Sequence, residues 1–366
     1  MRGFSDGAVG AGWPIASSPA NLSTVSVVTV APDKFKGSLD APRVAAAMAR
    51  GATSAGFDEV RVVPLADGGD GTLDTLVAAL GGSRRTARVT GPLGDPVEAE
   101  WALCRDGTAI VEMARASGLV LVEGRNDPLA ATTRGTGELI ATAVREGARR
   151  VMVCVGGSAT TDGGLGALEA LGWSIVGTEV VVACDVTTPF LDAARVYGPQ
   201  KGASPAEVAL LSRRLEALAD DLEQRTGVDV RAVAGGGAAG GLAGGLAAIG
   251  ARIEPGFEVV AAAVGLQDAL EGADLVLTGE GRLDATSFEG KVVGEVLEWA
   301  ADLGVPRRGV VVGQATDAGR DELATRGAWC DVLADRVWQT GEAFARAEEL
   351  VEEAARALAR RALGLD

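Results

Sequence analysis

The fold is decided by the stretch Val151-Met-Val-Cys-Val155, which runs directly into Gly156-Gly-Ser-Ala-Thr-Thr-Asp-Gly-Gly164. A short apolar run rich in β-branched residues predicts a buried parallel strand, and a helix is expected to follow as far as Leu171. The glycines permit positive φ and close approach of a ligand to the backbone. A helix start offers free N–H groups to an anion. The stretch therefore predicts a strand–loop–helix unit that binds phosphate, with a plain polar turn as the alternative.

Strand-like and helix-like segments alternate from the first apolar run onward. The pattern predicts a strand at Val25–Ala31 and a helix at Ala41–Arg50, capped by Asp40 and ended by Gly51. Further elements are predicted at Val60–Leu65, Thr72–Leu80, Thr136–Glu146, Glu179–Cys184, Pro205–Arg225, Asp274–Leu277 and Gly309–Val312. Alternating strands and helices predict an α/β fold with mainly parallel sheets.

Between Arg85 and Met113 the pattern changes to three short strands separated by turn signals, which predicts a small antiparallel meander. The chain ends in a predicted helix, Glu342–Leu363, with Phe344, Ala347, Val351, Ala354 and Leu358 on one face. No long linker separates the parts, so one domain is expected to be inserted into the other. We expect a discontinuous Rossmann-like α/β domain, residues 24–88 plus 286–366, and an inserted α/β domain, residues 89–285. Residues 1–23, rich in Gly, Ser, Ala and Pro, are expected to form a disordered extension and lack the pattern of a signal peptide.

Composition excludes several classes of function. The 366 residues include no histidine, which excludes a Ser-His-Asp or Cys-His mechanism and His-ligated zinc or haem. A net charge of -16 argues against nucleic acid and against anionic membranes as partners. The cysteines, Cys104, Cys154, Cys184 and Cys330, have no metal-site spacing and are expected to be reduced core residues of a cytoplasmic protein. No apolar segment is long enough to cross a membrane.

Charged side chains follow several of the predicted strands. They are Asp33, Lys34 and Lys36, then Asp67 and Asp70, then Asp185, and finally Glu280, Arg282 and Asp284. The carboxyl ends of parallel strands line one crevice, so these groups are expected to converge. Carboxylates together with lysines and an arginine suit phosphoryl transfer. A helix cap is the alternative for any single Asp.

A glycine run, Gly235-Gly-Gly-Ala-Ala-Gly240, formally matches a dinucleotide-binding pattern after the strand-like Val228–Ala234. The acidic residue at the required distance, Glu254, falls in a turn rather than at a strand end, which weakens this interpretation. Two alternatives nevertheless stay open beside phosphoryl transfer. One is an NAD(P)-dependent oxidoreductase of small hydroxy acids, and the other is a non-catalytic sugar-acid binding protein.

Several long motifs in order make the chain, from about Val27 to Leu358, resemble the type I glycerate kinase family. They include Ala31-Pro-Asp-Lys-Phe-Lys-Gly-Ser38, Ala66-Asp-Gly-Gly-Asp-Gly71, Thr132-Thr-Arg-Gly-Thr-Gly-Glu138, Gly156–Gly164, Gly198-Pro-Gln-Lys-Gly202 and Thr278-Gly-Glu-Gly-Arg-Leu-Asp284. The resemblance implies an active site in the cleft between two α/β domains. It also implies that D-glycerate is phosphorylated with ATP and Mg²⁺, with 2-phosphoglycerate as the favoured product.

The sequence departs from the usual pattern of this family in three places. It is shorter by about 25 residues between Gly172 and Val180, the size of an extra hairpin. The stretch after Pro189 is also shortened, and Ala285-Thr-Ser287 replaces the usual residues after Asp284. These departures put fine substrate specificity in doubt, and the sequence leaves the oligomeric state open.

Under this resemblance each candidate residue receives an expected role from its chemistry. Phosphates are expected on Gly156, Gly157, Ser158, Thr160, Gly68 and Gly69, and Mg²⁺ on Asp67, Asp70 and Asp162. Lys34, Lys36 and Lys201 are expected to neutralise the transferring group, with Lys201 also in the substrate-binding set. Arg134 or Arg282 would pair with the substrate carboxylate. Asp185 or Asp284 would accept the hydroxyl proton.

Overall fold

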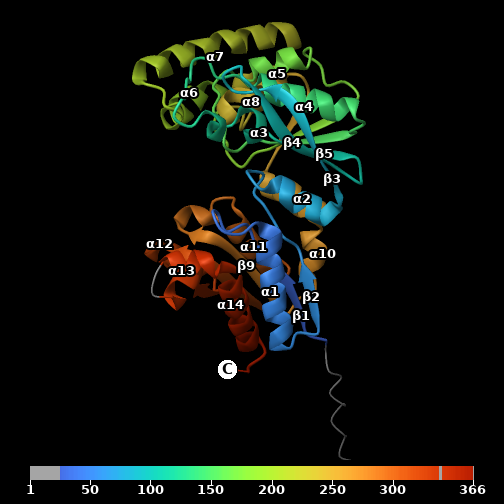
Figure 1. Cartoon of the computed structure of the whole chain (residues 1–366), viewed down its shortest axis with the longest axis vertical. Coiled ribbons are helices and arrows are strands. Elements are labelled where there is room, and N and C mark those ends of the chain that lie inside the picture. The colour runs from blue at the N-terminus through green and yellow to red at the C-terminus, as the bar shows by residue number, and fades with distance from the viewer. Residues whose placement is uncertain (1–24, 338–339, 366) are drawn as a thin grey trace, which may run out of the picture.

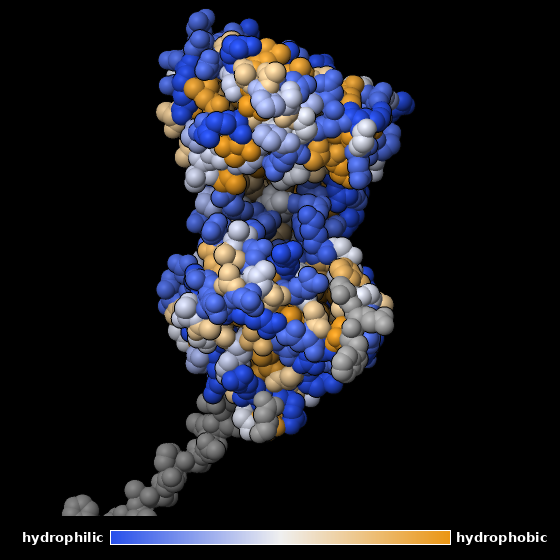
Figure 2. Space-filling view, turned by 90° about the vertical axis from the view of Figure 1, so that its left-hand side faces the viewer, coloured by the Kyte–Doolittle hydropathy of each residue, from blue (hydrophilic) through white to orange (hydrophobic). Residues whose placement is uncertain are grey.

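The computed structural model describes residues 25–337 and 340–365, so the predicted extension at residues 1–23 lies outside the described residues. These residues form two lobes, each built on one sheet and joined by a narrower, largely hydrophilic middle section (Figures 1 and 2). Within these two ranges, no helix combines the length and apolar character needed to cross a membrane. The α/β class with mainly parallel sheets is confirmed.

The lower lobe in Figure 1 contains a five-stranded sheet of order β11-β10-β9-β1-β2, in which every neighbouring pair is parallel. Its strands are β1 (Val27–Val30), β2 (Glu59–Val62), β9 (Leu275–Leu283), β10 (Arg307–Ala315) and β11 (Trp329–Val332). Apolar side chains join one face to α1 (Ala41–Ala55) and α14 (Ala347–Ala362). The other face packs on α10 (Leu266–Leu270), α11 (Val292–Asp302) and α12 (Asp317–Thr325).

The upper lobe contains a six-stranded sheet of order β3-β4-β5-β6-β7-β8. Its strands are β3 (Gly82–Thr90), β4 (Pro96–Cys104), β5 (Thr108–Glu112), β6 (Arg150–Cys154), β7 (Glu179–Ala183) and β8 (Arg252–Glu254). The first three strands pair antiparallel and the others parallel, so the predicted meander is confirmed. The outer helices of this lobe are α3 (Ala114–Ser117), α4 (Arg134–Arg145), α5 (Leu165–Ala170), α6 (Ala193–Tyr197), α7 (Pro205–Thr226) and α8 (Leu242–Ala248).

One hydrophobic core runs through both lobes. Helices α2 (Thr72–Leu80) and α9 (Gly256–Val264) cover the inner face of the six-stranded sheet, and Figure 1 places α2 between the lobes. Leu76 of α2 and Val260 of α9 belong to the same buried cluster as Met152 of β6. That cluster also contains Val276 of β9 in the other sheet. The lobes are therefore joined by buried apolar surface as well as by the crossing chain.

The predicted helix ends differ from the structure in two places. Asp40 caps α1, accepting from the Arg43 N–H at 2.8 Å, but α1 continues beyond Gly51. At Gly51 the backbone of α14 comes so close that an added Cβ would lie 2.4 Å from the Glu352 carbonyl oxygen, so this glycine serves helix packing. The predicted C-terminal helix is broken at Arg346 into α13 (Thr340–Ala345) and α14. The break leaves the Phe344 residue 54% exposed, whereas Ala347, Val351, Ala354 and Leu358 are buried as predicted.

Two further expectations need correction. Strand β9 pairs with β1 and β10, so it belongs to the five-stranded sheet, although residues 89–285 were expected to form the inserted domain. We therefore propose that the inserted domain corresponds to the six-stranded sheet, β3 to β8, with its covering helices. Cys330 is exposed, while the other three cysteines are buried and all four are free thiols.

The loops at the centre of the molecule pack so closely that three of their glycines leave no room for a side chain. A Cβ added to Gly256, at the start of α9, would lie 2.2 Å from the Asp67 carbonyl oxygen. A Cβ added to Gly68 would lie 2.9 Å from the Ala183 Cβ, and one on Gly156 would lie 3.1 Å from the Gly69 Cα. The segments that follow β2, β6 and β8 are therefore held in close contact with one another and with the end of β7.

We expect Gly256→Ala to destabilise the protein by about 2 kcal/mol or more, because the new methyl group must displace the Asp67 backbone. Thermal unfolding followed by circular dichroism measures this. Gly341→Ala is the matched control, because nothing lies within 4 Å of its added Cβ and its stability should stay close to that of the parent chain. An unchanged unfolding temperature for Gly256→Ala would contradict the close crossing.

Candidate functional site

Two cavities open at the carboxyl ends of the strands. The first, about 840 Å³, is lined by the loops after β2, β6 and β7 of both lobes, and includes Asp67, Gly156, Ser158 and Asp185. The second, about 500 Å³, belongs to the lower lobe and includes Asp33, Lys34, Glu280 and Arg282. Asp67 and Lys291 line both cavities. The two cavities are thus neighbours that meet at one carboxylate and one ammonium group.

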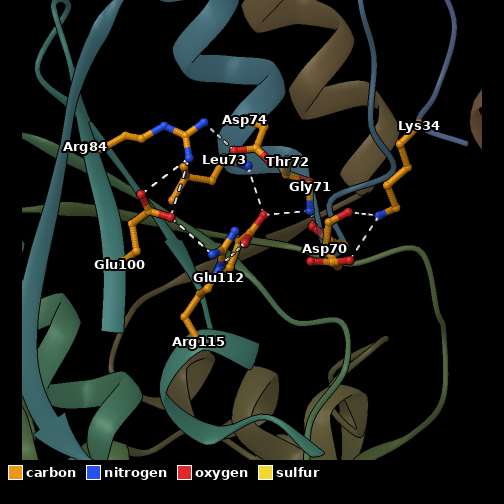
Figure 3. A network of polar contacts seen from close by, with 11 residues as sticks. Lys34, Asp70, Gly71, Thr72, Leu73, Asp74, Arg84, Glu100, Glu112 and Arg115 are labelled. Carbon is orange, nitrogen blue, oxygen red and sulfur yellow. Dashed lines mark hydrogen bonds and ion pairs between the residues drawn. The ribbon is translucent and has the colours of Figure 1, made fainter. Parts of the chain in front are cut away.

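A buried glutamate holds the loop that carries Asp67. Glu112 lies at the end of β5, and its Oε1 accepts from the backbone N–H groups of Gly71 at 2.8 Å and Leu73 at 3.0 Å (Figure 3). It thereby satisfies free donors at the start of α2. Its other oxygen accepts from the Arg115 guanidinium at 2.9 Å, and Arg115 also contacts Glu100 at 3.1 Å. The upper sheet thus fixes a loop that follows a strand of the lower sheet.

The carboxylates around Asp67 repel one another. Burial and the nearby Asp67 raise the pKa of Asp33 to about 7. Burial is also the main cause that raises the pKa of Glu280 to about 7. Burial and Asp67 raise the pKa of Asp185 to about 6, although Asp185 accepts from the Gly256 N–H at 2.6 Å. Groups with such shifts are typical of functional sites, where burial and like charges disfavour the ionised form until a positively charged ligand binds.

The donor atoms around Asp67 fit a hard divalent cation. The ligands are carboxylate oxygens, which Mg²⁺ prefers, and Oε1 of Glu280 is buried without a hydrogen-bond partner among the residues described. Across the same residues, no group of three or more side chains of the metal-binding types lies close enough to hold a metal ion. Mg²⁺ sites in phosphoryl-transfer enzymes commonly use one or two carboxylates together with the substrate phosphates.

The structure brings many of the predicted site residues to these two cavities. Those that line the first are Asp67, Gly68, Gly69, Gly156, Gly157, Ser158 and Asp185. Those that line the second are Lys34, Lys36, Arg282 and again Asp67. Asp70 is beside them, because its carboxylate pairs with the Lys34 ammonium at 3.6 Å.

Other predicted residues are in structural positions outside the described linings of both cavities. Asp162 is buried and accepts from the backbone N–H groups of Thr133 at 2.8 Å and Gly164 at 3.1 Å. Asp284 caps the short helix Ala285–Phe288, accepting from the Thr286 N–H at 2.9 Å, and the Thr286 hydrogen bonds lower its pKa. Arg134 pairs on the surface with Glu138 at 3.3 Å and with Glu169 at 3.4 Å. The helix-cap alternative therefore describes the contacts of both aspartates.

Lys201 is also behind the first cavity rather than in its lining. The residue is 2% exposed, and burial lowers the pKa of its ammonium to about 8. Its Nζ donates to the Thr160 carbonyl oxygen at 2.6 Å, and Thr160 is itself buried. Its neighbours Tyr197 and Gln200 do line the cavity. Lys201 thus ties the segment that follows Ser158 to the Gly198–Gly202 turn.

The predicted dinucleotide-binding pattern has a different structural role. No strand precedes Gly235, because the segment before it contains the 3-10 helix Val230–Ala232 instead of the predicted strand. An added Cβ on Gly240 would lie 2.0 Å from the Thr160 carbonyl oxygen, and one on Gly237 would lie 2.3 Å from that of Pro189. These glycines allow close backbone packing behind the first cavity.

Asp33 and Glu280 were expected to converge with the other strand-end charges but received no individual role, whereas Lys291 and Glu112 were not predicted at all. Asp33 and Glu280 follow or end strands, so their place at the carboxyl edge was a usable signal. Lys291 precedes α11 far along the chain, and Glu112 ends an apolar strand. No local pattern distinguishes those two from ordinary surface or capping residues.

A sequence model described as the glycerate kinase family matches residues 28–179 and 174–363. The chain belongs to the glycerate kinase family. It is 40% identical over 329 residues to the glycerate 2-kinase of Escherichia coli K12, covering 80% of this chain and 86% of that one. It is 39% identical over 373 residues to the glycerate kinase of Bacillus subtilis 168, covering 91% and 96%.

A solved structure has the same fold as this glycerate kinase family member. The crystal structure of a protein assigned as glycerate kinase 2 from Salmonella typhimurium LT2 aligns with a TM-score of 0.80 at 35% identity. The alignment covers 93% of this chain and 99% of the other. The resemblance inferred from the motifs and the prediction of a glycerate kinase enzyme are confirmed. The two segments matched by the family model overlap at residues 174–179, inside the region that was expected to be shorter than in the family.

We expect Asp162→Ala to destabilise this glycerate kinase family member by about 2 kcal/mol, because backbone donors at two helix starts lose a buried acceptor. Under a Mg²⁺-dependent mechanism, the Mg²⁺ concentration needed for half-maximal activity should not change. Asp67→Asn is the comparison variant, since it should raise that concentration while leaving those helix starts capped. If the Asp162→Ala protein is fully stable but needs a higher Mg²⁺ concentration, Asp162 is a ligand of the metal ion.

Asp33→Asn should stabilise the protein at pH 8. The raised pKa of about 7 means that folding favours the protonated carboxyl, so stability is lost as the pH rises from about 4 to about 7. Asparagine removes that cost, which a shift of about three pKa units puts on the order of 4 kcal/mol at pH 8, and the gain should vanish below about pH 4. Denaturant unfolding with a chelator present measures it, with the exposed Asp302→Asn as control. A pH-independent difference would contradict a buried, repelled Asp33.

Proposed function

We propose that the chain transfers the γ-phosphoryl group of ATP to a hydroxyl of D-glycerate, with 2-phosphoglycerate as the favoured product. Membership of the glycerate kinase family supports the reaction class and the acceptor. The single observation that carries the assignment of the site is that two cavities meet at Asp67 and Lys291, beside Asp185. A kinase needs two adjoining compartments, one for its donor and one for its acceptor, with charged groups where they meet.

In this proposal Asp185 is the base. It lines the first cavity, and its pKa of about 6 leaves it ionised at neutral pH but still able to hold a proton. The glycerate hydroxyl oxygen attacks the γ-phosphorus, and its proton passes to the Asp185 carboxylate. The bond between the γ-phosphorus and the bridging oxygen breaks, and ADP leaves with that electron pair. The proton on Asp185 is then released to water.

Asp284, the other candidate base, is less suited to the task. Its pKa is lowered by the hydrogen bonds from Thr286, and its oxygen is committed to the Thr286 N–H and hydroxyl at 2.9 and 2.7 Å. A carboxylate stabilised in this way is a weak base. We therefore assign Asp284 to the local fold and Asp185 to proton transfer.

The remaining charges would act on the phosphates. Lys34, Lys36 and Lys291 lie where they could neutralise the transferring group, and Arg282 lies on the same side. Mg²⁺ would be held by Asp67 together with Asp33 or Glu280, and when bound it supplies positive charge to the phosphate oxygens. Gly156, Gly157 and Ser158 line the first cavity, where backbone N–H groups and a hydroxyl can hold the acceptor in line with the donor.

The proposal is tested by incubating the purified chain with ATP, Mg²⁺ and a panel of small hydroxy acids, and resolving the products by NMR. We expect ADP and 2-phosphoglycerate from D-glycerate. Reduction of NAD with a hydroxy acid and no use of ATP would favour the oxidoreductase. Binding of D-glycerate without either reaction would favour a sugar-acid binding protein.

We expect Asp185→Asn to lower kcat by about 10²–10⁴-fold, because general base catalysis typically contributes that much. Thermal stability should be kept or raised, since the change removes a repelled charge. In the unchanged chain kcat/KM should fall about tenfold per pH unit below pH 6, where Asp185 becomes protonated. Steady-state kinetics from pH 5 to 8 measure both effects.

Asp284→Asn is the matched control and should keep kcat within about threefold, because only a helix cap is altered. The assignment of the base fails if Asp284→Asn abolishes turnover and Asp185→Asn does not.

A further inference from the structure

The second cavity has two walls of opposite character. One wall carries Lys34 and Lys36 from the loop after β1 and Arg282 from the end of β9. The other is apolar and comes from the 3-10 helix Leu333–Arg336 that follows β11 and from α13 and α14; these two α-helices lie side by side in Figure 1. Its side chains are Leu333, Ala334, Ala343, Phe344 and Ala347. A ligand that fills this cavity therefore needs both an anionic part and an apolar part.

Phe344 is the most unusual member of the apolar wall. The break at Arg346 removes it from the buried face of the C-terminal helices, and 54% of the residue is exposed. An added Cβ on Gly37 would lie 3.8 Å from the Phe344 ring, so the ring faces the loop that carries the lysines. An exposed phenyl ring at a cavity mouth offers a flat surface on which an aromatic ligand can stack.

The positive charge of the cationic wall is only partly neutralised by ion pairs. Arg282 is exposed over 68% of its side chain, and its ion pair with Asp284 is long, at 4.0 Å. Lys291 continues the positive charge to the boundary with the first cavity. The apolar wall, the lysines and the boundary with the first cavity follow one another in this order. A ligand with an aromatic base at one end and a chain of phosphates at the other fits that order.

The first cavity differs from the second in its charge. Its described lining combines glycines, the hydroxyl groups of Ser158, Thr187 and Thr188, and apolar residues such as Leu119 and Val155, and Lys291 is the one cation in it. Its aromatic residue, Tyr197, shares a hydrogen bond of 2.7 Å with Thr188. Such a lining suits a small polyhydroxy acid beside the Asp185 base better than it suits a nucleobase.

We propose that the nucleoside end of the phosphoryl donor binds in the second cavity, with its base stacked on Phe344 and its phosphates directed past Lys34 and Lys36 toward Asp67 and Lys291. The inference rests on the proposed kinase function, and it assigns the first cavity to the acceptor. Gln314, on the same cavity, has an amide that can donate to and accept from the edge of the base.

The test is calorimetric binding of ADP and of inorganic tripolyphosphate, both with Mg²⁺, to the full chain and its variants. We expect Phe344→Ala to weaken ADP binding by about tenfold, since base–aromatic stacking contributes about 1–3 kcal/mol per base. Tripolyphosphate binding and the KM for glycerate should not change, because neither ligand uses the ring. Phe344→Trp should restore ADP binding, and Val176→Ala, at a residue 94% exposed in the other lobe, is the control.

The outcomes separate the two proposals. If Phe344→Ala binds ADP as tightly as the parent chain while glycerate is phosphorylated, the kinase proposal stands and this inference is overturned. If ADP binding falls in Phe344→Ala but no phosphorylated glycerate forms, the nucleotide site stands and the proposed acceptor fails. A parent chain that binds no ADP at all would overturn both.

Discussion

The close crossing of backbone at Gly68, Gly156 and Gly256 is the constraint on which the rest of the site depends. Side chains at these positions would meet backbone or Cβ atoms at 2.2 to 3.1 Å, so the segments after β2, β6 and β8 can meet one another and the end of β7 only through glycine. The crossing places Asp67 of one lobe beside Asp185 of the other. Glu112, at the end of a strand of the upper sheet, holds one of these loops by capping the start of α2. The buried cluster that contains α2 and α9 joins the two lobes.

Bringing these loops together has an electrostatic cost. Asp33 and Glu280 are half-buried near Asp67, Asp185 lies on the wall of the first cavity, and the pKa of each is raised mainly by loss of hydration. A fold selected for stability alone would separate or replace such groups. A cation and a phosphate chain with bound metal would offset their repulsion, so the same feature that weakens the free protein prepares it for its ligands.

Most of the fold could be predicted from the chain, because each strand and helix has a local pattern. Helix α2 lies at Thr72–Leu80 as predicted, and β6 differs from its predicted range by one residue at each end. The end of α1 and the break at Arg346 could not be predicted, because both depend on packing between helices remote in sequence. The membership of β9 in the lower sheet is likewise a matter of long-range pairing.

The candidate site was predictable only in part, for a related reason. Position after a strand indicated Asp67 and Asp185, and both line the first cavity, because strand ends share one edge of a sheet. The same signal could not separate them from Asp162 and Asp284, whose oxygens bond to backbone at helix starts. Lys291 reaches the boundary of the cavities only through the tertiary fold, and so does the outward turn of Phe344.

The central claim is that phosphoryl transfer occurs where the two cavities meet. The most direct measurement is a crystal structure of the chain with a non-hydrolysable ATP analogue, Mg²⁺ and D-glycerate. We expect the γ-phosphoryl group beside Asp67 and Lys291, and the reacting glycerate hydroxyl within hydrogen-bond distance of Asp185. Glycerate bound against Lys34 and Lys36, with the nucleobase in the cavity beside Asp185, would contradict this claim.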